Sequence, residues 1–88
     1  MRYLFFPGRV FGTPGIRELI SQGTDISSFL KRHLQGDWGD ISDEDKESNN
    51  GALISGERII SAYFVTPEIK IWIVTDGGMT TIMFPSEY

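Results

Sequence analysis

The sequence has no cysteine and a single histidine among its 88 residues. Disulfide bonds and thiolate metal sites are therefore excluded, and one histidine without a second histidine or a cysteine is a weak indication of a metal site. A chain without cysteine fits a reducing compartment, so we expect a cytoplasmic protein. No cofactor is expected, because 40% hydrophobic and 12% aromatic residues are typical of a chain that folds by itself.

Positive charge and long apolar runs are also scarce. Eight lysines and arginines stand against twelve acidic residues, and the formal net charge is -4. Binding to phosphate backbones requires clustered cations, so we expect no direct nucleic-acid ligand. The apolar run from Tyr3 to Phe6 stops at Pro7, which is too short for a membrane span, and no membrane contact is expected. A chain of this length supports one core, so residues 1–88 are predicted to form a single domain.

Hydrophobic periodicity predicts two or three helices in the first part of the chain. The clearest apolar stripe repeats at helical spacing before Gly36 and consists of Ile26, Phe29, Leu30, His33 and Leu34. A shorter helix is predicted to begin at Thr13-Pro14 and to end before Gly23. A third helix is predicted from Asp43 to about Ser55, with an alternative end at Gly51 after two asparagines, since Asn and Gly are poor helix formers.

Strand-like sequence occurs at both ends of the chain. The run from Tyr3 to Phe6 is typical of a short buried strand, which Arg9 to Phe11 continues. Near the C-terminus the apolar period changes to two, in segments separated by short turns: Glu57 to Thr66, Ile69 to Thr75 and Thr80 to Phe84. The predicted fold is therefore α+β, with an N-terminal short strand and two to three helices packed on a C-terminal three-stranded antiparallel meander.

The predicted sheet is apolar on both faces. In its middle strand Ile71 and Ile73 face one side, whereas Trp72 and Val74 face the other. A sheet with one solvated face alternates more cleanly, so either helices wrap both faces or another molecule covers part of one. We expect a homodimer made through the sheet, because a two-fold dimer is the commonest closed assembly. The alternative is a monomer in which residues 3–11 fold across the second face.

His33 is the obvious candidate for a general base or a metal ligand, with Asp37 and Asp40 near it in the sequence. Its place on the apolar stripe favours a structural role, in which the ring is buried and hydrogen-bonded. One hypothesis is therefore a small hydrolytic or metal-assisted enzyme that uses His33, Asp37 and Asp40. The other is that His33 supports the core alone.

Six carboxylates lie between Asp37 and Glu47. Their spacing does not match a calcium-binding loop, but it suits the positive N-terminus of the helix that follows and a surface for a basic protein partner. Trp38 lies between Gly36 and Gly39, where its ring either closes the core or anchors an interface. The residues predicted to contact a partner are Asp37, Trp38, Asp40, Asp43, Glu44, Asp45 and Glu47.

Three segments are distinctive in combination: Phe6 to Gly15, Arg32 to Asp40 with its Gly-Asp-Trp-Gly-Asp sequence, and Ile59 to Tyr63 with Lys70 to Ile73. Together they resemble a group of small uncharacterised bacterial proteins that are often labelled plasmid-related. No activity or catalytic residue comes with this resemblance, but it implies a mobile-element protein that acts on host machinery. The leading hypothesis is a small non-enzymatic interaction protein, a regulator or inhibitor of a host protein, that acts through the acidic surface.

Overall fold

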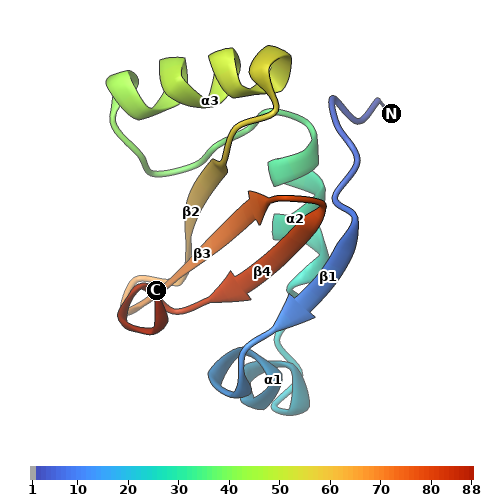
Figure 1. Cartoon of the computed structure of the whole chain (residues 1–88). Helices are drawn as coiled ribbons and strands as arrows, with labels where there is room; N and C mark the ends of the chain where they lie inside the picture. The colour runs from blue at the N-terminus through green and yellow to red at the C-terminus, as the bar shows by residue number, and fades with distance from the viewer. Residues whose placement is uncertain (1) are drawn as a thin grey trace.

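A computed structural model describes residues 2–88 and has an α+β fold with a four-stranded mixed sheet (Figure 1). The elements are β1 (Arg9–Gly12), α1 (Pro14–Ser21), α2 (Ser27–Leu34), α3 (Asp43–Ser55), β2 (Ile59–Thr66), β3 (Ile69–Asp76), β4 (Met79–Met83) and a final 3₁₀ turn (Pro85–Glu87). The strand order is β1-β4-β3-β2. Among residues 2–88, no helix is long and apolar enough to cross a membrane.

Strands β2, β3 and β4 form the antiparallel meander that the sequence predicts. Tyr63 pairs with Ile71 between β2 and β3, and Ile73 pairs with Ile82 between β3 and β4. Both glycines of the Gly77-Gly78 turn have positive φ, at 59° and 78°, which a tight hairpin turn requires. The alternating apolar pattern therefore predicted all three strands to within about two residues of their observed ends.

The N-terminal strand differs from the prediction. Strand β1 begins at Arg9 and runs parallel to β4, whereas Tyr3 to Phe6 form no strand. Gly8 has a φ of +67°, and an added Cβ would lie 1.9 Å from the Gly78 carbonyl oxygen, so the chain enters the sheet only after this close approach. The preceding segment instead lies against the end of α2, where the Leu4 amide donates to the Leu34 carbonyl at 2.8 Å.

Helices α1 and α2 cover one face of the sheet, and Figure 1 shows α2 behind the strands. Thr13 caps α1 by accepting a hydrogen bond from the Ile16 amide, and Gly36 follows α2 with a φ of 82°, as the sequence predicts. The core on this face consists of Ile16, Leu19, Ile26, Tyr63, Ile71, Ile73 and Ile82. The opposite face carries no helix in the described part of the chain.

Helix α3 lies beyond the edge of β2 and covers neither face of the sheet in full (Figure 1). It runs without interruption to Ser55 and ends at Gly56, which has a φ of 79°, so the alternative end at Gly51 is not observed. Ala52 of α3 packs with Trp38 and Ile59 in a second, smaller core cluster.

Candidate functional site

The segment between α2 and α3 is fixed to the free edge of β2. The Ala62 amide donates to the Trp38 carbonyl at 3.1 Å, and the Asp40 amide donates to the Ala62 carbonyl at 2.7 Å. Gly39 between them has a φ of +75°, and an added Cβ would lie 2.0 Å from the Ala62 oxygen. Only glycine fits this contact, so Gly39 is required where the acidic segment joins the sheet.

Asn49 of α3 forms hydrogen bonds with another residue on the same edge of β2. Its side-chain amide donates to the Ile60 carbonyl at 2.8 Å, and its side-chain oxygen accepts from the Ile60 amide at 3.2 Å. The amide group thus replaces a neighbouring strand at one residue of β2. Sequence reasoning treated Asn49 only as a poor helix former and missed this role.

A cleft of about 430 Å³ separates the acidic segment from the helix-free face of the sheet. Ile60 and Trp72 contribute apolar surface to it, with the buried Ala62 between them and the acidic segment, and Asp40 and Asp45 contribute exposed carboxylates. An apolar floor with charged groups at its edge is a common form of binding site for an amphipathic ligand.

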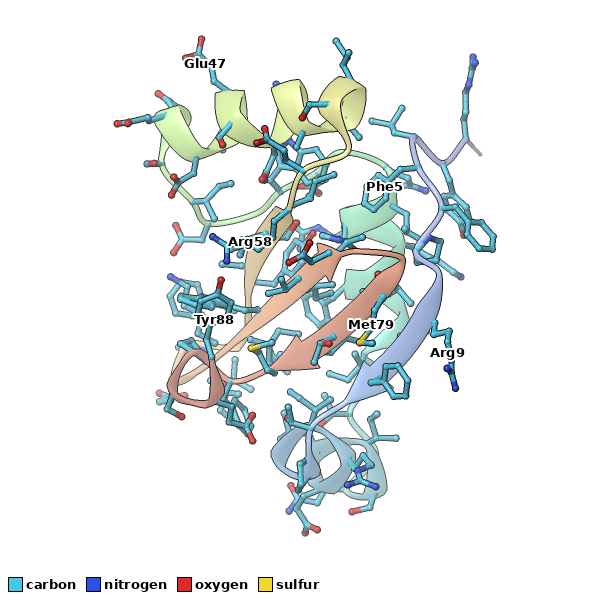
Figure 2. All side chains as sticks on the ribbon, in the orientation of Figure 1. Phe5, Arg9, Glu47, Arg58, Met79 and Tyr88 are labelled. Carbon is cyan, nitrogen blue, oxygen red and sulfur yellow. The ribbon has the colours of Figure 1, made fainter. Side chains whose placement is uncertain are left out.

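Two cations also line this cleft, and each has a partner within the chain. Lys70 Nζ lies 3.1 Å from Asp40 Oδ2, and both side chains are partly exposed. The Arg58 guanidinium donates to the Tyr88 hydroxyl, and Figure 2 labels both side chains. The Tyr88 ring lies 5.4 Å from the Trp72 ring. Tyr88 therefore packs beside the cleft and supports Trp72.

The acidic side chains of α3 are exposed, and Asp45 among them also lines the cleft. Asp43, Glu44 and Asp45 lie in the first turn of α3, where Ser42 caps the helix by accepting from the Asp45 amide at 3.1 Å. Glu47 projects away from the sheet (Figure 2). With six acidic residues and one lysine, residues 37–47 carry a formal charge of -5.

Trp38 is only 4% exposed and belongs to the second core cluster. Its ring lies 6.2 Å from Phe5 and 5.9 Å from His33, and its Nε1 donates to the Asn50 side chain at 3.1 Å. The core interpretation of Trp38 is confirmed, and its indole does not reach the surface where a partner would dock. Trp72 is the tryptophan that lines the cleft.

His33 is fully buried at the centre of a chain of hydrogen bonds across three strands. Nδ1 lies 2.6 Å from the Ser61 hydroxyl, and Nε2 lies 2.9 Å from the Thr75 hydroxyl. Thr75 in turn lies 2.7 Å from Thr80, whose hydroxyl donates to the Pro7 carbonyl at 2.7 Å. The predicted place of His33 on a buried stripe is confirmed.

These hydrogen bonds determine which ring nitrogen carries the proton. Thr80 gives its only proton to Pro7, so Thr75 must donate to Thr80 and must accept from His33 Nε2–H. Burial lowers the pKa of His33 to about 4, so the neutral ring accepts from Ser61 at Nδ1. The ring is therefore fixed in its Nε2–H form.

The structure does not bring His33 together with the two carboxylates predicted to assist it. Asp37 pairs with Arg32 at 2.7 Å, and this guanidinium lowers the pKa of the Asp37 carboxyl. Asp40 pairs with Lys70, on the cleft side of the segment. Across residues 2–88, no group of three or more histidine, aspartate or glutamate side chains is arranged to hold a metal ion. The short His33–Ser61 contact resembles a base and nucleophile, but both residues are 0% exposed, so a substrate does not reach them.

No protein-family model, no curated protein and no solved structure matches this chain. The resemblance to plasmid-related proteins stays a prediction.

Proposed function

We propose that this protein is a small non-enzymatic interaction protein, a regulator or inhibitor, that binds a basic amphipathic segment of a protein partner in the cleft beside Asp40. The observation that carries this proposal is the combination of apolar floor and acidic edge in one site. Ile60 and Trp72 offer apolar contact, and Asp40 and Asp45 offer carboxylates at the same opening. A segment with alternating lysine and apolar side chains matches both surfaces.

The charge of the acidic segment supports a basic partner. Residues 37–47 carry a formal charge of -5 and are largely exposed, so they attract a cationic segment before contact. The Asp40–Lys70 pair leaves 60% of the Asp40 side chain and 34% of the Lys70 side chain exposed. An exposed ion pair contributes about 0 to 1 kcal/mol, so a partner cation replaces Lys70 at small cost.

The position of the chemically reactive groups also favours binding over catalysis. His33 and Ser61 are buried on the helix-covered side of the sheet, whereas the cleft lies on the opposite side. A binding module tolerates His33→Gln if the fold survives, whereas an enzyme that uses His33 loses turnover. Following the resemblance to plasmid-related proteins, we propose a host protein as the partner.

A peptide with alternating lysine and leucine residues serves as a probe of the cleft. We expect it to shift the NMR signals of the Trp72 indole and of the Asp40 amide, with an affinity that falls as salt is added. Replacing both cleft carboxylates, Asp40→Asn with Asp45→Asn, should weaken binding several-fold. The matched control, Glu18→Gln with Glu68→Gln, changes the net charge equally at exposed positions outside the cleft and should bind almost as wild type does.

Two results would count against the proposal. One is an unchanged Trp72 signal at saturating peptide, and the other is equal weakening by the cleft and control variants. The same four substitutions apply to a natural partner captured from the source cell. Such a partner should be lost from the Asp40→Asn/Asp45→Asn protein and retained by the control protein.

A further inference from the structure

The two edges of the sheet differ in whether other parts of the chain form hydrogen bonds with them. At β2, Asn49 and the segment from Trp38 to Asp40 occupy the outward backbone groups of Ile60 and Ala62. At the other end of the strand order, β1 pairs with β4 alone, and nothing in the described part of the chain pairs with its outer side. Figure 1 shows β1 as the outermost strand. An open edge of this kind is a template for another strand.

The hydrogen bonds of β1 show which of its backbone groups are free. The Arg9 amide donates to Gly78, and the Thr13 amide donates to Ile82, so the odd-numbered residues face β4. Backbone groups alternate along a strand, and those of Val10 and Gly12 therefore point away from the sheet. A partner strand could form hydrogen bonds with two backbone amides and two backbone carbonyls there.

Exposed apolar side chains lie on the same edge. Val10 and Phe11 of β1 are 43% and 42% exposed, and Phe6, which precedes β1, is 84% exposed. Met79, opposite Arg9 in the β1–β4 register, is exposed too. Exposed apolar side chains beside an unpaired strand are typical of an interface.

We propose that β1 pairs with β1 of a second copy of this chain, in antiparallel orientation about a two-fold axis at Phe11. In this register Val10 of one copy lies opposite Gly12 of the other, and each such pair exchanges two backbone hydrogen bonds. All four free groups on each strand are then used. The result is one continuous sheet of eight strands.

The side chains of β1 fit this register. Phe11 meets Phe11 of the second copy at the position where side chains on paired strands approach most closely. Val10 lies opposite Gly12, where the Ile16 and Arg17 side chains of α1 occupy the space that a side chain on Gly12 would take, so Val10 packs against them. Arg9 lies opposite Thr13, so the two-fold axis brings no like charges together, and the first acidic residue of the sequence is Glu18. This self-complementarity is the reason for choosing a second copy over an unrelated strand.

Sedimentation equilibrium of the full chain tests the pairing. At tens to hundreds of micromolar we expect a mass approaching twice 9.9 kDa, together with slowed hydrogen exchange at the Val10 and Gly12 amides as concentration rises. Val10→Pro should give a monomer, because proline removes an outward N–H that β4 does not use. Val10→Ala is the matched control, keeps the N–H and should remain dimeric.

The Phe11 position gives a second test that does not depend on proline. Phe11→Lys and Phe11→Glu should each be monomeric alone, since like charges would face each other across the two-fold axis. An equimolar mixture should restore a dimer through a lysine–glutamate pair. A single-chain mass for wild type at every concentration would overturn the proposal and leave the edge to a different strand. A dimer that persists in Val10→Pro, or a mixture that stays monomeric, would overturn the β1 register.

Discussion

Acidification should destabilise the fold through His33 before it affects the carboxylates. The ring is 0% exposed and lies between the hydroxyl groups of Ser61 and Thr75. Neither hydrogen-bond partner is a carboxylate that would stabilise the positive charge of an imidazolium. Burial lowers its pKa to about 4 in the folded protein, against an ordinary value of 6.5. Protonation at Nδ1 would also break the hydrogen bond that Ser61 donates to this atom.

The sign and size of the effect follow from these two pKa values. Below pH 6.5 the unfolded chain binds a proton that the folded chain does not, so stability falls as the pH is lowered from 6.5 toward 4 and becomes constant again below that. Between about pH 7 and about pH 5, the loss in the free energy of unfolding is about 2 kcal/mol. That is a large part of the stability of a small domain.

Urea unfolding at several pH values, followed by circular dichroism, measures this loss. The pKa values of Asp37 and Glu87 are lowered by their hydrogen-bond partners, so their contributions disappear only at pH values below this range. His33→Gln should abolish the slope even if it lowers stability at every pH. If that variant does not fold, NMR of wild type should still show a neutral, Nε2-protonated ring at about pH 5. A flat stability profile, or a charged ring at that pH, would refute the reasoning.

Three further substitutions test how the acidic segment is held, each by urea unfolding. Trp38→Ala should cost about 3 to 5 kcal/mol, because the ring fills the second core cluster, and an unchanged stability would contradict its burial. Asn49→Ala should cost about 1 to 3 kcal/mol and speed hydrogen exchange at the Ile60 amide, whereas Ser48→Ala, on an exposed neighbour, should do neither. Gly39→Ala should cost clearly more than Gly77→Ala, which has positive φ but open space and should lose about 1 kcal/mol; equal losses would contradict the contact with Ala62.

The periodicity of apolar residues was sufficient to predict each helix or strand that buries one of its faces in the core. The stripe that includes Ile26 and Leu34 predicted α2, and the alternation around Ile71 and Ile73 predicted β3, because burial of one face dictates both patterns. The predicted range of α3, Asp43 to about Ser55, is confirmed, and only the alternative end suggested by the poor helix formers Asn49 and Gly51 is wrong. The helix continues there because Asn49 bonds to Ile60, a tertiary contact that offsets its low propensity.

The N-terminal segment shows a second limit of local composition. Tyr3 to Phe6 have strand-forming side chains, but the sheet begins at Arg9 because Gly8 must pass close to Gly78. Of the four residues only Phe5 packs inward, against His33 and Trp38. Which neighbour a segment meets is a property of the whole fold, so side-chain preference alone could not place it.

Part of the cleft could be predicted from the sequence. Alternation already puts Ile60 and Ala62 on one face of β2, and Lys70 and Trp72 on one face of β3. The pairing register, with Ala62 opposite Trp72, is what joins them into a single floor. That register depends on the turn at residues 67–68 and the irregularity near Thr66, and neither can be fixed from periodicity alone.

The two apolar faces of the predicted sheet suggested a dimer that covers one of them. The structure offers a different explanation. Val74 and Met83 lie on the helix-free face, yet they are only 7% and 8% exposed. The Trp72 and Tyr88 rings pack edge to face on this side, so side chains from the sheet and the C-terminal 3₁₀ turn provide cover without an α-helix. Among the exposed apolar residues, Val10 and Phe11 lie on β1 and Phe64 lies on β2, the two edge strands of the sheet. The proposed dimer through β1 therefore fits the structure better than a dimer through a face of the sheet, because the β1 edge offers unpaired backbone groups as well as apolar contact.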